Sequence, residues 1–213
     1  MRNKEKDARD MAEKNAAFLK ASYELFTEKS IESVSMEEIA LRSGYGVATL
    51  YRYYTNKTRL VIAVATETWK KFSEKYKGSR KQTFDEMSAV QIFDFFLESF
   101  IILYTDHKDM LKFNQMFNIY IQSSKVGLED LEPYEEMIGS LAKQFHMMYE
   151  KAKTDKTLKT DAPEEEVFST TLHIMLAAIT RYAVGLVYKP SANFDEVKEL
   201  RHLKGLLLKE YSL

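Results

Sequence analysis

The sequence predicts an all-α protein in which an N-terminal three-helix domain precedes a larger helical domain. Three observations support this fold class. The 213 residues include only 3 prolines and 7 glycines, so tight β-turns are few. Apolar residues recur at three- and four-residue spacing through most of the chain, which is the helical period. The hydrophobic content of 45% is enough for one large core or two modest ones.

The helices are expected in the following order. A first helix over 8–29 carries an inner stripe that includes Phe18 and Leu25. Two short helices follow between residues 35 and 54, separated by a glycine turn. Longer helical patterns then cover 56–77, 84–105, 109–125, 130–155, 163–188 and 193–210. The polar stretch 154–161 is expected to be a mobile surface loop.

The two short helices make the most specific pattern in the chain. Ser35 can accept a hydrogen bond from the backbone N–H of Glu38, whose side chain can return to the Ser35 N–H as a capping box. Gly44 follows the last turn, where a residue with positive φ ends a helix at little cost. Val47–Tyr53 then forms the next helix. This arrangement, at about 35–54, is typical of a helix-turn-helix whose second helix enters the major groove of DNA.

Eight residues are candidates for DNA contact. Val47 and Ala48 are expected to touch base edges, most plausibly thymine methyls, and Arg52 to read guanine or bind the backbone. The hydroxyl groups of Thr49, Tyr51 and Tyr53 and the ammonium group of Lys57 are expected to bind phosphates, together with the N-terminus of the following helix. The DNA-binding candidates are Ser35, Val47, Ala48, Thr49, Tyr51, Arg52, Tyr53 and Lys57.

Residues 12–60 resemble the DNA-binding domain of the tetracycline-repressor (TetR) family of bacterial regulators. The matching residues are Ala21, Leu25-Phe26, Ile39-Ala40 and Gly44, and above all Thr49-Leu50-Tyr51-Arg52-Tyr53-Tyr54 followed by Asn56-Lys57 and Leu60. Two positions depart from the family pattern: Ser30 stands in place of a glycine and Tyr54 in place of a phenylalanine. The resemblance implies a helix-turn-helix domain, expected over 8–56, and a helical regulatory domain over 57–213 with an inducer pocket and a dimer interface.

Composition and charge fit a cytoplasmic DNA-binding protein. The chain has no cysteine, which excludes disulfides and thiolate zinc sites and fits a reducing compartment. Residues 1–80 carry 16 lysines and arginines against 11 aspartates and glutamates, whereas the remainder carries 15 against 21; the basic end suits phosphates. No signal-peptide pattern is seen, and the longest apolar stretch, 172–188, contains His173 and Arg181, so no membrane span is expected.

Aromatic and methionine side chains are dense between residues 84 and 149. They supply large, adaptable apolar surface that can either fill a core or line a cavity for an apolar ligand. For each single residue core packing is the simpler interpretation, whereas the family resemblance implies a cavity in the domain as a whole. The pocket candidates, which include two residues from the following apolar helix, are Phe96, Phe100, Tyr104, Phe113, Phe117, Tyr120, Met137, Phe145, Met148, His173 and Met175.

The helix expected at 163–188 is apolar on nearly every side, so it needs cover on more than one face. A second copy of the chain can provide part of that cover; a helix buried within one chain is the alternative. The last helix adds an apolar stripe, and together the two predict half of a four-helix dimer interface, as the family resemblance also implies. The interface candidates are Phe168, Leu172, Ala178, Val184, Val197, Leu200 and Leu207.

Catalytic and metal-binding motifs are not found in the sequence. There is no glycine-rich phosphate loop, no Gly-x-Ser-x-Gly elbow and no pair of metal-binding histidines. His107, His146 and His202 stand apart in the sequence, without an i, i+4 partner histidine or a carboxylate set at zinc-ligand spacing. No enzyme activity, metal site or cofactor is therefore predicted.

Together these observations predict a homodimeric transcriptional regulator, most simply a repressor, that leaves its operator when an unidentified small apolar or aromatic inducer binds. Its expected partners are double-stranded operator DNA, a second copy of itself and the inducer. The alternatives are a similar regulator without a small-molecule inducer, an activator, and an all-helical adaptor that binds a partner protein but no DNA. The intact surface from Thr49 to Lys57 favours DNA binding over the adaptor.

Overall fold

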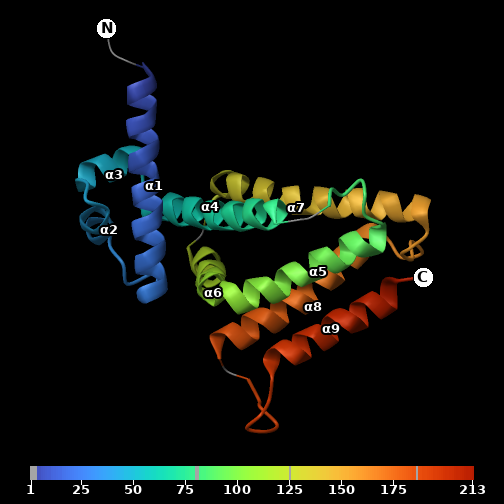
Figure 1. Cartoon of the computed structure of the whole chain (residues 1–213). Coiled ribbons are helices and arrows are strands. Elements are labelled where there is room, and N and C mark those ends of the chain that lie inside the picture. Colours follow the sequence, from blue (N-terminus) through green and yellow to red (C-terminus); the bar gives the residue numbers. More distant parts are fainter. Residues whose placement is uncertain (1–3, 80–81, 125, 186) are drawn as a thin grey trace. The chain divides into compact units, whose positions relative to one another are not determined.

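The computed structural model describes residues 4–79, 82–124, 126–185 and 187–213 (Figure 1). Within these ranges the chain is helical, without a β-strand, so the predicted all-α fold is confirmed. The helices are α1 (Lys4–Glu28), α2 (Met36–Ser43), α3 (Val47–Tyr53), α4 (Lys57–Gly78), α5 (Ala89–Asp106), α6 (Lys108–Ser123), α7 (Leu128–Asp155), α8 (Glu164–Val184) and α9 (Glu196–Tyr211).

Local capping groups explain where several helices begin and end. Ser35 caps α2, because its side chain accepts a hydrogen bond from the Glu38 N–H at 3.1 Å. Gly44 ends α2 in the left-handed region with φ of 78°, a conformation that favours glycine. Helix α5 begins at Ala89 and not near residue 84, because Ser88 and Gln91 form a capping box.

The helices divide between two compact units, each of which is described by itself. The first consists of the described residues up to Phe72 together with Phe113–Met137. In it α1 packs against α2, and α2 against α3 (Figure 1). Its core gathers side chains from α1, α2, α3, α4 and α6, among them Phe18, Leu25, Phe26, Ile39, Leu50, Leu60, Val61, Val64, Phe113 and Phe117. This core holds the helix-turn-helix in place.

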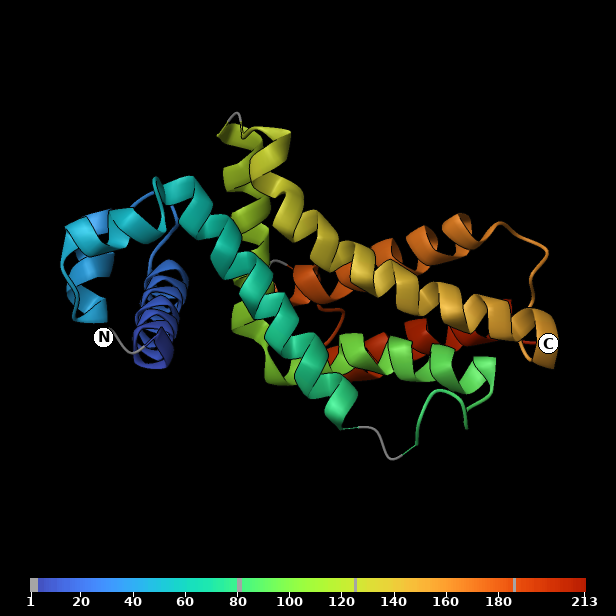
Figure 2. The ribbon, with the colours of Figure 1, turned by 90° about the horizontal axis from the view of Figure 1, so that it is seen from above.

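The second unit consists of Ser73–Lys112 and Ile138–Leu213. Helices α5, α8 and α9 lie side by side in it, as both views show (Figures 1 and 2). Most of its buried apolar side chains come from these helices and from the C-terminal part of α7, and they include Phe93, Leu97, Phe100, Tyr104, Phe145, Met148, Met175, Ile179 and Leu200. The unit is therefore a helical layer structure with an aromatic interior.

The stretch 154–161 is anchored, which corrects the expectation of a mobile loop. Leu158 is buried and forms a β-bridge with Ser212. The carboxylate of Asp155 accepts hydrogen bonds from the backbone N–H groups of Ala89 and Thr157. Burial raises the pKa of Asp155, but these hydrogen bonds outweigh it and leave the pKa below its ordinary value. The polar side chains of this stretch therefore form hydrogen bonds to the start of a neighbouring helix and within the loop itself, which accounts for its polar composition.

The two compact units do not coincide with the predicted domains at 8–56 and 57–213. Helix α4 up to Phe72 and the segment Phe113–Met137 belong to the same unit as the helix-turn-helix. Buried residues such as Leu60 and Val64 on α4 join its core. Where the regulatory function begins along the chain therefore stays a prediction.

Candidate nucleic-acid interface

Helix α3 has one buried face and one exposed face. Leu50 is fully buried in the core of the first unit. On the opposite side Val47 is 36% exposed and Tyr51 is 44% exposed, and Ala48 and Arg52 are also exposed. This places four of the predicted DNA-contact residues together on the solvent side of one short helix.

The exposed side of α3 is polar and carries positive charge. Arg52 donates a hydrogen bond from Nη2 to Oγ1 of Thr49 at 3.3 Å, which holds its guanidinium over the middle of the helix. Residues 47–57 contain no acidic side chain. An arginine held by a neighbour and facing solvent is suited to a phosphate or to the acceptor edge of guanine.

Lys57 lies at the first turn of α4, but its ammonium group is partly engaged. It donates a hydrogen bond to the backbone carbonyl of Glu32 at 3.1 Å. Burial lowers the pKa of Lys57, and the charge of Glu32 opposes that change. The lysine still has further N–H donors for a phosphate. The side chain of Asn56 caps the same helix by accepting from the Arg59 N–H at 2.9 Å, a role that the sequence analysis missed.

The two tyrosines at the end of α3 brace it against α1. Tyr53 packs edge-on against Phe18, with ring centroids 5.4 Å apart, and its hydroxyl donates to the carbonyl oxygen of Met11. Tyr54 is buried, and its hydroxyl donates to Oδ1 of Asn15 at 2.6 Å. Burial raises the pKa of Tyr54 to about 12. The structure thus gives Tyr53 an intramolecular partner where a phosphate contact was expected.

Helix α2 is tied to α1 by ion pairs. Arg42 donates two hydrogen bonds to the carboxylate of Glu28, at 3.1 and 3.0 Å. Lys29 pairs with Glu38, whose pKa is lowered by this hydrogen bond and, to a smaller degree, by the Ser35 N–H. Bidentate pairing fixes orientation as well as distance. It therefore sets the angle at which α2 leaves the end of α1.

The ligand-pocket candidates separate into different environments. Phe96, Phe100 and Phe145 form a contiguous aromatic cluster in the second unit, with centroids 5.4 Å apart for Phe96–Phe100 and 5.7 Å for Phe96–Phe145. Phe168, which was predicted to lie at the dimer interface, also belongs to this cluster, and its ring centroid lies 5.0 Å from that of Phe145. Tyr104, Met148 and Met175 are also buried in this unit.

Four pocket candidates belong to the first unit instead. The ring centroid of Phe113 lies 5.4 Å from that of Tyr23, and its ring stacks on Phe26. Phe113 and Phe117 are both part of the core that supports the helix-turn-helix. The other two are Tyr120, whose hydroxyl lies 3.1 Å from that of Thr58, and the half-buried Met137. His173 is exposed on α8, so its predicted place inside a pocket is corrected.

Two features of the second unit were missed from the sequence. The hydroxyl of Thr171 is buried and has no hydrogen-bond partner among the described residues, an uncommon state for a buried polar atom. A hollow of about 650 Å³ also opens beside α5 and α9. It is lined by Tyr76, Ser79, Gln82, Met87, Val90, Gln91, Asp94, Phe95, Glu98, Ile102, Leu208 and Ser212, none of which was a pocket candidate.

The dimer-interface candidates are only partly at the surface. Leu200 and Leu207 are buried by their own chain, which corrects their assignment to a contact surface. Val184 is 45% exposed, and Ile174 and Leu206, which were not candidates, are 40% and 50% exposed. The remaining candidates, Leu172, Ala178 and Val197, are half-buried.

One group of possible metal ligands was not anticipated from the sequence. His146, Glu150 and Glu164 bring their donor atoms within 4.8 Å of one another. Glu150 stands at i+4 from His146, a spacing that was visible in the sequence and was overlooked. Glu164 comes from the next helix, and its approach depends on tertiary structure.

Comparisons with known proteins agree with this geometry. Residues 18–64 match the family described as bacterial regulatory proteins, tetR family. A curated HTH-type transcriptional regulator of Staphylococcus aureus is 27% identical over 154 residues, which cover 71% of this chain and 79% of that protein. Another from the same species is 24% identical over 182 residues, covering 84% of this chain and 94% of that protein. These relatives are regulators and not enzymes.

Solved structures share the fold over nearly the whole chain. The transcriptional regulator FadR of Bacillus subtilis, solved in complex with stearoyl-CoA, superposes with a TM-score of 0.68 at 16% identity and covers 91% of this chain and 97% of its own. The ketosteroid transcriptional regulator KstR2 of Mycobacterium tuberculosis superposes with a TM-score of 0.63 at 12% identity, covering 93% and 95%. At such identities the likeness establishes the fold alone.

Proposed function

Because this chain belongs to the TetR family of bacterial transcriptional regulators and is a DNA-binding regulator, we propose that it is a homodimeric repressor whose hold on its operator is released by a small apolar ligand. The observation that carries the DNA-binding half of this proposal is the exposed face of α3, with Leu50 buried behind it. The residues proposed to contact DNA and the buried leucine that anchors them in the core therefore lie on the same short helix.

The proposed DNA contacts follow from this exposed face. Val47 and Ala48 meet base edges, and Thr49, Tyr51 and Arg52 bind phosphates or a guanine edge. The N-terminus of α4 adds Lys57 and its free N–H groups at the phosphate backbone. Two copies of the chain place their α3 helices about 34–36 Å apart, in successive major grooves.

The proposed dimer contact is the outer face of α8 together with α9. Ile174 and Val184 on α8 and Leu206 on α9 are all well exposed, and exposed apolar side chains on packed helices are candidates for an interaction surface. Among the described residues, α8 alone is long and apolar enough to cross a membrane, with 28% of that window buried within the chain. Because the relatives are DNA-binding regulators, we assign this face to a second copy and the protein to the cytoplasm.

The proposed ligand site lies in the aromatic interior of the second unit. The cluster of Phe96, Phe145 and Phe168 supplies apolar surface, and the unpaired hydroxyl of Thr171 supplies a polar anchor. A ligand that prefers the dimer with a different spacing of its α3 helices releases DNA by shifting populations. FadR of Bacillus subtilis, in complex with stearoyl-CoA, shows that this fold can hold a molecule with a long apolar tail.

A gel shift on the DNA upstream of the protein's own coding region tests the proposal. We expect a discrete complex whose affinity falls steeply with salt, because phosphate contacts release counterions. Addition of apolar and aromatic compounds should dissociate that complex. A complex that no compound dissociates contradicts the inducer, and a protein that forms no salt-sensitive complex contradicts operator binding there.

A further inference from the structure

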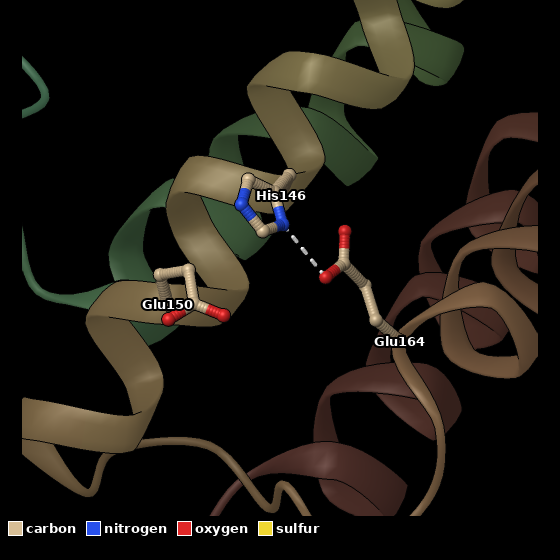
Figure 3. A group of neighbouring side chains, drawn as sticks. All are labelled: His146, Glu150 and Glu164. Carbon is tan, nitrogen blue, oxygen red and sulfur yellow. Dashed lines mark hydrogen bonds and ion pairs between the residues drawn. The ribbon is translucent and has the colours of Figure 1, made fainter.

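We propose that His146, Glu150 and Glu164 form a site for a divalent transition-metal ion, and that Zn²⁺ is the ion this set fits. His146 and Glu150 lie one turn apart on α7, and Glu164 stands at the start of α8 (Figure 3). The three donor atoms lie within 4.8 Å of one another. The site is confined to the second unit and does not depend on the proposed operator or inducer.

The spacing of the donors is close to that of a metal complex. Nδ1 of His146 and Oε2 of Glu164 are 2.8 Å apart and share a hydrogen bond, which a bound ion would replace. Around tetrahedral Zn²⁺, with bonds of about 2.0–2.2 Å, donor atoms stand about 3.4 Å from one another. Glu150 projects from the same stretch of α7 as His146 (Figure 3), and its exposed carboxylate lies within 4.8 Å of the other two donors.

The connection between the two helices is fixed, which holds Glu164 opposite His146. Tyr149 is buried next to the site, and its hydroxyl donates to the carbonyl oxygen of Ala162 at 2.5 Å. The carbonyl of Pro163 then accepts the backbone N–H groups of Glu166 and Val167, which starts α8. The backbone on either side of the connection is therefore held in place before an ion arrives, a condition that favours binding.

The charge at the site leaves room for a cation. Lys153 pairs with Glu150 at 2.5 Å. Two carboxylates therefore face one lysine ammonium and one imidazole. Because Lys153 occupies an oxygen that the ion needs, it is a competitor, and its removal should strengthen binding.

The kind of donor selects the kind of ion. One imidazole nitrogen with two carboxylate oxygens suits Zn²⁺ and its neighbours in the transition series, whereas Ca²⁺ and Mg²⁺ prefer oxygen ligands throughout. The His146 side chain is 58% exposed and that of Glu164 27%, so an ion can enter from solvent and water can complete its coordination. A bound ion would fasten the C-terminal part of α7 to the start of α8.

Competition with a chromophoric zinc indicator, on full-length protein without a polyhistidine tag, tests the site. We expect one Zn²⁺ per chain, at least tenfold weaker binding for His146→Ala and for Glu164→Gln, and tighter binding for Lys153→Ala. His202→Ala, at another exposed histidine on α9, serves as the control and should bind as the unchanged protein does. Thermal melts without zinc establish that each variant is folded.

Two results would overturn the proposal. One is Zn²⁺ binding that His146→Ala leaves unchanged, or that His202→Ala weakens equally, since either identifies an adventitious ion on surface histidines. The other is an X-ray absorption spectrum of the one-to-one zinc complex without imidazole scattering. Weaker binding by Lys153→Ala would likewise contradict the role of competitor given to that lysine.

Discussion

Arg59 donates a hydrogen bond from Nε to Oδ1 of Asp130 at 2.8 Å, which joins the first turn of α4 to the first turn of α7. Its neighbour Thr58 meets the hydroxyl of Tyr120 on α6 at 3.1 Å. All four residues belong to the first unit. The turn that follows the helix-turn-helix is thus held by side chains from 113–137, a segment that the sequence analysis had assigned to the regulatory domain.

The pair of Arg59 and Asp130 should contribute little to stability. The two side chains are 51% and 23% exposed, and exposed ion pairs contribute about 0–1 kcal/mol. A double-mutant cycle with Arg59→Ala and Asp130→Ala, followed by urea denaturation, measures their coupling. We expect a coupling free energy below about 1 kcal/mol. A value several times larger would mean that the pair is a principal support of the fold.

Stability and DNA binding should be separable on α3. Leu50→Ala removes a fully buried side chain and should lower the free energy of unfolding by about 2–5 kcal/mol. Val47→Ala, on the exposed side of the same helix, should change it by less than about 0.5 kcal/mol yet weaken DNA binding. Chemical denaturation and fluorescence anisotropy measure the two effects. Equal destabilisation by both substitutions would refute the assignment of the two faces.

Lys57→Ala should weaken binding to all DNA sequences alike. A phosphate contact carries no sequence information, and its loss should reduce the slope of log affinity against log salt by about one unit. Anisotropy titrations at several salt concentrations measure this slope, and Lys70→Ala, at an exposed lysine further along α4, is the matched control. A change in base preference without loss of affinity would contradict the role given to Lys57.

The outer face of α8 should control the oligomeric state. Ile174→Glu and Val184→Glu each place a charge among apolar side chains of the proposed dimer contact, where an unpaired charge is strongly unfavourable. Sedimentation velocity should find monomers for both variants. Ile119→Glu, at an isoleucine on α6 that is 53% exposed, should remain dimeric. A dimer that persists in both α8 variants would place the interface elsewhere.

Acid should loosen the junction between α1 and α2. The hydrogen bond from Arg42 lowers the pKa of Glu28 below its ordinary 4.5. Stability from a lowered carboxyl pKa is complete above the unfolded value and is lost as the pH falls through the folded value. The melting temperature should therefore fall below about pH 4.5, and less steeply for Glu28→Gln. Glu135→Gln, an exposed carboxylate on α7, should melt with the same pH dependence as the unchanged protein.

The sequence predicted local features well and long-range ones poorly. The limits of α2 and α3 follow from Ser35 and Gly44, whose effects act over three or four residues. The neighbours of Phe113 could not be predicted in this way. An aromatic residue on an apolar stripe reads the same whether it fills a core or lines a pocket, and its contact with Phe26 joins positions far apart in the chain.

The metal-ligand group shows the same division. The i, i+4 spacing of His146 and Glu150 is a sequence signal, whereas the approach of Glu164 requires the fixed connection between α7 and α8. The unpaired hydroxyl of Thr171 is likewise a property of packing. No pattern in the sequence distinguishes this threonine from one that hydrogen-bonds to its own helix.

Selection of bound sequences from random double-stranded DNA, followed by anisotropy titration of the recovered site over a range of salt, tests the central claim most directly. We predict a two-fold symmetric site with half-sites one helical turn or a multiple apart, bound by a dimer with an affinity that falls linearly on a log–log plot against salt. Enrichment of no sequence, or affinity indifferent to salt, would contradict the claim that the exposed face of α3 reads DNA.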